Sequence, residues 1–137
     1  MAKRGARVRN PLDRLREIIR PWPETDERIS HGSPTWWGGK KTFASFHDNH
    51  HGDGRVAVWI KSNADAQEDL VGANPAVFFI PPYVGPSGWV GVQVEGDVDW
   101  DLVATLLLAG YRAVVPKRAL KLLDAEPGSI APSNRGL

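Results

Sequence analysis

The sequence predicts an α+β domain of two layers, in which helices cover one face of a five-stranded antiparallel sheet. Three observations predict this class. Residues 55–61 and 89–95 alternate along the chain as half-buried strands do. Short glycine-containing turns join consecutive strand segments, which implies antiparallel pairing. Apolar residues recur at helical spacing in 11–20 and 97–109. The expected order of elements is α-β-β-β-α-β-β-α-α, an arrangement with a single sheet.

Length and composition indicate one domain. The chain has 137 residues, of which 42% are hydrophobic and 24% charged, as in globular proteins with one core. We predict this domain over residues 10–125, between a basic flexible tail at 1–9 and a disordered tail at 126–137. The sequence has no cysteine, which excludes disulfides and fits a cytoplasmic protein. No apolar run approaches the roughly 20 residues that cross a bilayer, so we expect no membrane association.

The first helix is defined by its two ends. Asn10 followed by Pro11 is typical of an N-cap and a first helical residue, and Pro21 stops the helix. Four apolar residues between these ends share one face, which we expect to cover the sheet: Leu12, Leu15, Ile18 and Ile19.

Three strand segments follow, a weak one at 27–36 and two others at 42–47 and 55–61. Gly38-Gly39 and residues 50–54 are the turns between them, because Gly and Asp adopt positive φ at low cost. The stretch PTWWGGKKTF is therefore predicted to be a hairpin whose two lysines face solvent.

The strand at 55–61 has two distinct faces. Its alternation places Val56, Val58 and Ile60 toward the core, and Ala57, Trp59 and Lys61 on the opposite side. We therefore expect Trp59 to be half exposed, and Trp89 to have the same relation to the valines that follow it.

A second helix is predicted where Asp65 and Glu68 form a capping box, and Asn74-Pro75 ends it. The remaining elements follow in order: a short strand at 76–80, a proline-rich loop at 81–88, a strand at 89–95, a helix that begins at Asp97 and Asp99, and a last helix that begins at Pro116.

Four motifs occur in the same order as in a known family: GGKKTFA at 38–44, WIK at 59–61, WVGV at 89–92 and GYRAVVPK at 110–117. On these motifs the chain resembles the MmcQ/YjbR-like family of small bacterial proteins, over about residues 12–124. The resemblance implies an α+β fold similar to the secretion-chaperone-like architecture. It also implies binding of double-stranded DNA through winged hairpins, and it supplies no catalytic residue.

The leading functional hypothesis is thus a non-enzymatic DNA-binding protein that needs no cofactor. Lysine is a flexible point charge suited to phosphate contacts, and exposed tryptophans stack on bases. Trp37 and Trp59 are the candidates for stacking. The candidates for phosphate contact are Lys40, Lys41, Arg55, Lys61, Arg112, Lys117, Arg118 and Lys121.

Other motifs favour simpler interpretations. GGKKT lacks the first glycine and the Ser/Thr of a P-loop, and the segment after it is predicted to be a strand. Asp97, Asp99 and Asp101 are explained by helix capping. A set of acids and histidines between two strands is predicted to be a solvated hairpin tip without a metal: His47, Asp48, His50, His51 and Asp53.

Two alternatives stay open. The sheet and its tryptophans could serve a protein-interaction module that forms a homo-oligomer. A small ligand could instead bind beneath the loop at 81–88, and a deep apolar pocket lined by Trp89 and Tyr83 would favour that function.

Overall fold

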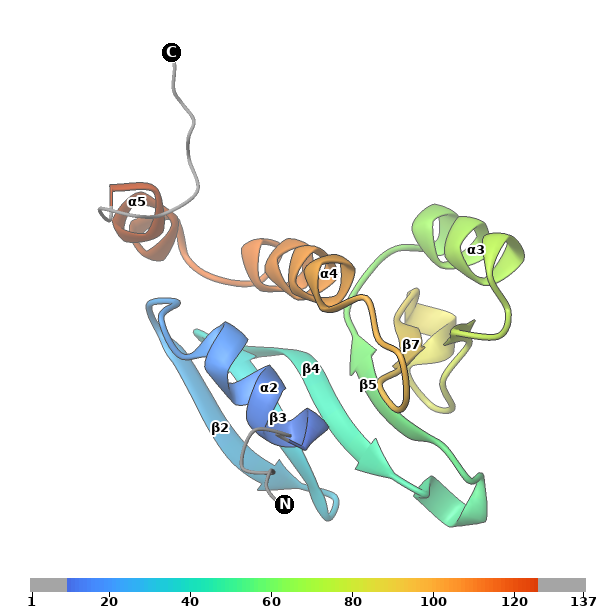
Figure 1. The fold of residues 1–137 in the computed structure, drawn as a ribbon. Coiled ribbons are helices and arrows are strands. Elements are labelled where there is room, and N and C mark those ends of the chain that lie inside the picture. Colours follow the sequence, from blue (N-terminus) through green and yellow to red (C-terminus); the bar gives the residue numbers. More distant parts are fainter. Residues whose placement is uncertain (1–9, 126–137) are drawn as a thin grey trace.

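The structure, a computed structural model, describes residues 10–125 and contains a six-stranded antiparallel sheet (Figure 1). The strand order is β2-β3-β4-β5-β7-β6. Its strands are β2 (Thr25–Ser30), β3 (Ser33–Gly38), β4 (Lys41–Asp48), β5 (Val56–Ile60), β6 (Phe78–Phe79) and β7 (Val90–Gln93). The tails predicted at 1–9 and 126–137 lie outside the described residues.

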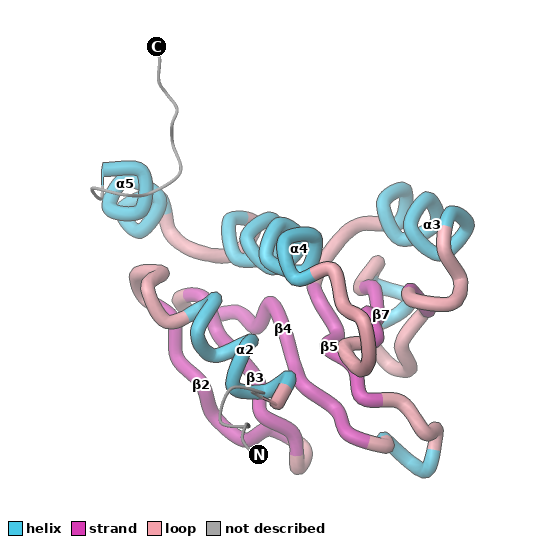
Figure 2. Tube along the Cα trace, in the orientation of Figure 1, coloured by secondary structure: helices cyan, strands magenta, loops and turns pink. Residues whose placement is uncertain are grey.

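Four α-helices complete the described part of the chain: α2 (Pro11–Ile19), α3 (Ala64–Ala73), α4 (Trp100–Arg112) and α5 (Lys117–Ala125). Two short 3-10 turns, η1 (His50–Gly52) and η2 (Gly85–Ser87), lie within the loops that follow β4 and precede β7 (Figure 2). None of the helices in the described ranges has the length and apolar character needed to cross a membrane.

The α+β class is confirmed, but the predicted count of five strands is wrong. The segment expected as one weak strand at 27–36 is two strands, β2 and β3, paired antiparallel. His31 and Gly32 form the turn between them, with φ of 52° and 81°. Two successive positive φ values suit a tight hairpin, and histidine is one of the residues that tolerate this conformation. The sequence lacks the Asn-Gly pair that usually indicates such a turn.

The predicted helix starts are partly confirmed. The Asn10 side chain accepts a hydrogen bond from the Asp13 N–H at 2.8 Å, as an N-cap does. Asp99 caps α4 in the same way. The predicted capping box at Asp65 is wrong, because Asn63 is the N-cap of α3 and accepts from the Ala66 N–H at 2.9 Å.

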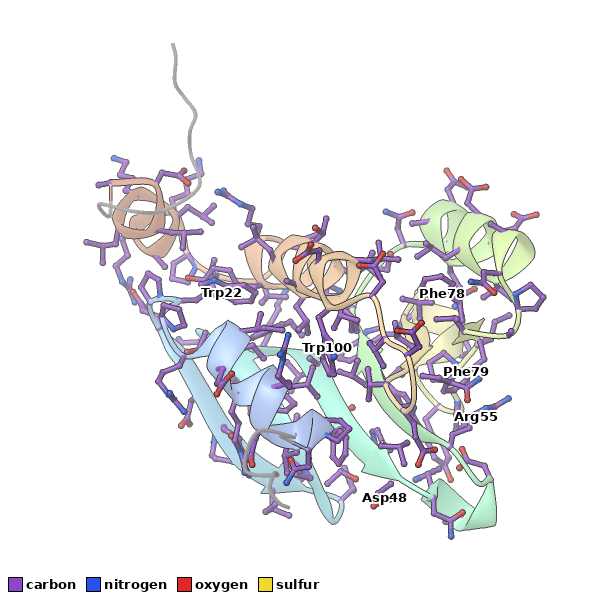
Figure 3. The ribbon with its side chains drawn as sticks, viewed as in Figure 1. Trp22, Asp48, Arg55, Phe78, Phe79 and Trp100 are labelled. Carbon is purple, nitrogen blue, oxygen red and sulfur yellow. The ribbon has the colours of Figure 1, made fainter. Side chains whose placement is uncertain are left out.

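The main core lies between the sheet and the helices. Figure 1 shows α2 and α4 over the same face of the sheet, which we call the helical face. Figure 3 shows Trp100 at the start of α4, where the Arg14 guanidinium lies 5.0 Å from its ring centre. Tyr111 of α4 is fully buried, and its hydroxyl donates to the Pro23 carbonyl at 2.7 Å. That contact ties the helix to the turn that precedes β2.

An irregularity in β4 turns two consecutive residues toward this core. Trp36 pairs with Ala44 and Trp37 pairs with Thr42, so the pairing with β3 skips Phe43. Such a bulge reverses the alternation of side chains along a strand. Phe43 and Ala44 therefore both pack in the main core, and Thr42 is directed to the opposite side of the sheet.

The opposite side of the sheet, here called the pocket face, carries a smaller apolar cluster. Ala57, Trp59, Phe79 and Trp89 are buried there, with Val84 packed against them. The predicted faces of β5 are confirmed, since Val56, Val58 and Ile60 pack in the main core. The expectation that Trp59 is half exposed is wrong: only 4% of its surface is exposed, because His47 stacks on its ring and His50 and Val84 pack against it.

Candidate ligand-binding pocket

A cavity of about 750 Å³ opens on the pocket face. This volume falls within the roughly 300–1,000 Å³ typical of small-molecule sites. Its walls come from β2, β3, β4, β5 and the loops at 49–54 and 80–89. The lining residues are Ser30, His31, Thr35, Thr42, Ser45, His47, His50, His51, Trp59, Tyr83, Val84 and Trp89.

The floor of the pocket is built by alternation on two neighbouring strands. Ser45 and His47 are two residues apart on β4 and therefore share a face. Ser45 pairs with Trp59 of β5 across the ladder. The order of these strands in the sheet thus places a hydroxyl, an imidazole and an indole side by side.

His47 is held on both nitrogens. Its Nε2 is 2.8 Å from the Ser45 hydroxyl, and its Nδ1 is 3.1 Å from the Ser33 hydroxyl. Burial, together with the nearby His50, lowers the pKa of His47 to about 4. The imidazole is therefore neutral at pH 7, so one nitrogen donates and the other accepts. The two serines take the complementary roles.

Two polar atoms beside this floor are buried without a hydrogen-bond partner, Nε1 of Trp59 and Nε2 of His50. The two rings meet edge to face, with centroids 5.0 Å apart. A buried polar group without a partner costs about 1–3 kcal/mol. Both residues line the cavity, but these two nitrogen atoms themselves are covered by protein.

The loop at 80–89 is fastened over the pocket by α3. Nε2 of Gln67 donates to the carbonyl oxygens of Gly85, at 2.9 Å, and Trp89, at 2.6 Å. Gly88 has φ of +90°, and a Cβ there would lie 2.8 Å from Cα of Asn63. Only glycine fits this conformation and this close approach. The loop is consequently seated against the first turn of α3.

The loops at 49–54 and 80–89 meet at the mouth of the pocket. The Tyr83 hydroxyl lies 3.4 Å from Nε2 of His51. Both residues have positive φ, 66° for Tyr83 and 49° for His51, an uncommon conformation for such side chains. Backbone strain of this kind clusters at ligand sites because the surrounding structure must enforce it.

The lining of the pocket contains one serine–histidine pair, Ser45 and His47. Ser45 and His47 are close enough for proton transfer, as in a nucleophile–base pair. An imidazole with a pKa near 4 is, however, a weak base at neutral pH. The described residues contain no group of three or more His, Cys, Asp or Glu side chains placed to hold a metal.

The predicted solvated tip at 47–53 is therefore only partly confirmed. His51 and Asp53 are exposed, and His50 is half buried. His47 is buried, because it belongs to the regular part of β4 and stacks on Trp59. Its ring was assigned to the tip because it is close in sequence to the other histidines.

Three of the predicted phosphate contacts are occupied by acidic partners. Arg112 lies 2.6 Å from Asp124, and Arg118 makes two bonds to Glu24 of 2.5 and 2.7 Å. Arg55 lies 3.9 Å from Asp53, and its guanidinium sits 4.0 Å from the ring centre of Phe79, beside which Figure 3 shows it.

The lysine candidates separate into two places. Lys40, Lys41, Lys117 and Lys121 are exposed. A Cβ built on Gly39 lies 3.0 Å from Pro116, so the tip of the β3–β4 hairpin and the start of α5 meet at one end of the molecule. Lys61 is half buried at the end of β5, against α4.

The two stacking candidates differ in access. Trp37 is partly exposed, with the Arg28 guanidinium 4.0 Å from its ring centre. Trp59 is enclosed in the pocket, and His47 covers one face of its ring.

Sequence reasoning missed Ser33, Ser45 and Gln67 at this site. The alternation of 42–47 gives one usable signal, because it places Ser45 and His47 on one face. Nothing in the sequence pattern links Gln67 to the loop that it holds.

The comparisons with known proteins bear on the family and the fold. In solved structures, the crystal structure of Deinococcus radiodurans protein DR2400, with a DUF419 domain, is similar at a TM-score of 0.67 and 21% identity. The match covers 91% of this chain and 95% of that one, and at this identity it shows the fold alone. The comparison with curated proteins finds no match. The YjbR family model matches residues 21–113. The chain therefore belongs to the YjbR family.

Proposed function

We propose that this protein binds a small organic ligand in the pocket beneath the loop at 80–89, without acting as an enzyme. The observation that carries this proposal is the 750 Å³ cavity itself, whose lining combines two tryptophans with serine, threonine and histidine side chains. Apolar walls with a few placed polar groups are the usual composition of ligand sites. Trp89 and Tyr83 both line the cavity, as the ligand-binding alternative requires.

The scaffold supports a preformed site. The floor lies on adjacent, central strands of the sheet, and Gln67 fastens the covering loop at two carbonyls. A ligand therefore meets side chains whose positions are already fixed, which lowers the entropic cost of binding.

A fragment screen by ligand-observed NMR tests the proposal. Val84→Trp adds a large side chain at the wall of the cavity, and we expect it to abolish the binding of most hits. Ile29→Trp is the control, because Ile29 is exposed on β2 and does not line the cavity. Melting curves of both variants confirm folding. A screen without hits, or hits that Val84→Trp retains, would overturn the proposal.

A second candidate function is contact with the phosphates of double-stranded DNA. The observation that favours it is that Lys40 and Lys41 lie at the same end as Lys117, through the Gly39–Pro116 contact. Lysines gathered on one end act together on a polyanion. Arg112 and Arg118 contribute less, because acidic side chains already neutralise them. The two functions use different surfaces and are tested separately.

A further inference from the structure

We infer that β2 pairs edge to edge with β2 of a second copy of this chain, in an antiparallel register that sets Asp26 opposite Arg28. The inference concerns the outer edge of the sheet and is independent of the proposed ligand-binding function. Three observations lead to it: the free edge of β2, the scarcity of features that would protect this edge, and the order of its charges.

The outer edge of β2 is unpaired in the described part of the chain. β2 ends the sheet, and β3 is the one described strand that pairs with it (Figure 1). The Gly39 N–H donates to the Glu24 carbonyl at 2.9 Å, which sets the residues of β2 that bond to β3. Since bonding alternates along an antiparallel pair, the N–H and C=O groups of Thr25, Glu27 and Ile29 point away from β3. These groups are therefore placed to bond to another strand.

β2 lacks most of the features that usually protect an edge strand. Such strands are commonly short, bulged, or guarded by proline or lysine. β2 has six residues, pairs with β3 in one unbroken register, and contains neither proline nor lysine. Its one large apolar side chain, Ile29, is 67% exposed. The opposite edge of the sheet, β6, has two residues, so β2 is the edge suited to pairing.

The order of charges along β2 is complementary to itself. A two-fold axis perpendicular to the sheet sets each residue opposite a residue on the same face. With the axis at Glu27, Asp26 of each copy lies opposite Arg28 of the other, and Thr25 lies opposite Ile29. Opposite charges and β-branched side chains stabilise a sheet when they face each other across strands. An axis at Asp26 or at Arg28 would instead set like charges against each other.

This register also sets Glu27 opposite Glu27 of the second copy, and Arg16 offsets that repulsion. Each Glu27 carboxylate accepts bonds from Nη2 of its own Arg16 at 2.8 Å and from Nε at 3.0 Å. The other two charges are ordered as well. Asp26 and Arg28 lie 2.8 Å apart, and the Arg28 guanidinium is 4.0 Å from the ring centre of Trp37. Side chains that are ordered before association lower its entropic cost.

Sedimentation equilibrium and amide exchange by NMR test the edge. A pair of six-residue strands is a small interface, so we expect a dimer with a dissociation constant of about 100 μM. At that affinity the amides of Thr25, Glu27 and Ile29 should exchange about threefold more slowly at about 1 mM protein than at about 0.05 mM. The amides of Asp26 and Arg28 should change little, because they already bond to β3.

Two charge variants test the register. Asp26→Arg and Arg28→Asp each give an edge with two charges of the same sign, so each variant alone should associate at least about tenfold more weakly than the wild type. An equimolar mixture of the two should regain about the wild-type affinity, because opposite charges again face each other. Asp69→Arg and Lys121→Asp make the same changes in net charge at exposed positions of α3 and α5. Alone or mixed, these controls should associate as the wild type does.

Four results would overturn the inference. The first is a wild type that stays monomeric up to about 1 mM. The second is a dimer in which the amides of Thr25, Glu27 and Ile29 are no slower than in the monomer, because another surface would then form the contact. The third is a mixture of the two edge variants that associates no better than each alone, and the fourth is a control mixture that associates more tightly than the wild type. Melting curves check the variants, and if one does not fold, amide exchange in the wild type decides.

Discussion

The imidazole of His47 lies parallel to the indole of Trp59, with ring centroids 3.5 Å apart and planes inclined by 20°. Stacking of this kind, together with bonds from Ser33 and Ser45, fixes both rings in the floor of the pocket. It also buries His47 in a form that cannot easily accept a proton. The pocket and the stability of the protein are therefore linked through one side chain.

His47 predicts a loss of stability in mild acid. Its pKa is about 4 in the folded protein and about 6.5 when unfolded. Between these values the unfolded state binds more protons, so the free energy of unfolding is full above pH 6.5 and falls as the pH drops toward 4. We expect a loss of about 2 kcal/mol, discounted for the part of the ring that reaches solvent. Urea unfolding at a series of pH values measures it.

The control for this prediction is His47→Gln, which keeps hydrogen-bonding capacity but does not titrate. Its stability at pH 7 should be lower than that of the wild type, and its pH dependence between 6.5 and 4 should be flatter. A variant with the wild-type pH profile would show that another group causes the acid sensitivity.

Gly91 should not tolerate a side chain. A Cβ at this position would lie 2.4–2.7 Å from three ring atoms of Phe79. Gly91→Ala must displace that ring from the pocket face, and we expect a loss of about 1–3 kcal/mol. Gly72→Ala is the matched control, because a Cβ there meets open space within α3, and it should stabilise by about 0.5–1 kcal/mol. Thermal melts measure both.

A double variant tests whether the ring of Phe79 causes the loss of stability in Gly91→Ala. Phe79→Leu removes most of the clash, so Gly91→Ala should cost less in that background than in the wild type. If the losses of stability of the two single variants add up to that of the double variant, the ring of Phe79 is not what excludes the methyl group.

Gln67→Ala should loosen the loop over the pocket without unfolding the domain. It removes both bonds from Gln67 to the carbonyls of Gly85 and Trp89. Amide exchange at Ser87 and Gly88 should become about tenfold faster, while exchange in α4 changes little. Gln93→Ala is the control, since Gln93 Nε2 donates to the Ala76 carbonyl instead. Equal changes in both variants would argue that Gln67 has no special role in holding the loop.

The DNA hypothesis predicts a salt-dependent contact at Lys40 and Lys41. Each phosphate that is neutralised contributes about −0.9 to the slope of log affinity against log salt. Lys40→Ala with Lys41→Ala should weaken binding to all duplexes alike and flatten that slope by up to about 2. Stability should change by less than about 0.5 kcal/mol, because both residues are exposed.

Lys61→Ala is the comparison for this test, because Lys61 lies apart from that end of the molecule. It should leave the slope nearly unchanged. If the wild type shows no salt-dependent binding at about 50 mM salt, the DNA hypothesis is wrong.

Much of the local structure could be read from the sequence. The alternation in 55–61 predicted which side of β5 faces the core, and Val58 and Ile60 are fully buried there. The Asn10-Pro11 pair predicted the start of α2, and Gly39, with φ of +69°, forms the turn of the β3–β4 hairpin. These features depend on neighbouring residues, so local propensity and period are sufficient to predict them.

The missed features have a different origin. The turn at His31-Gly32 carries a residue that sequence rules seldom associate with a hairpin. The pairing that skips Phe43 depends on how β4 fits against β3, and it interrupts the alternation of faces along the strand. Neither feature leaves a periodic pattern, because each interrupts one.

The sequence by itself determined the start of α2, the turn between β3 and β4, and the two faces of β5. Only the tertiary structure decided that Ser45, His47, Trp59 and Tyr83 form one pocket. Periodicity reports which side of a strand a residue occupies, but not what covers that side. The sequence predicts Trp59 to be half exposed because alternation places it with Lys61, on the side opposite the core valines. Its burial results from His47 and His50, which contact its ring, and from the loop at 80–89, which Gln67 and the glycine at position 88 hold in place.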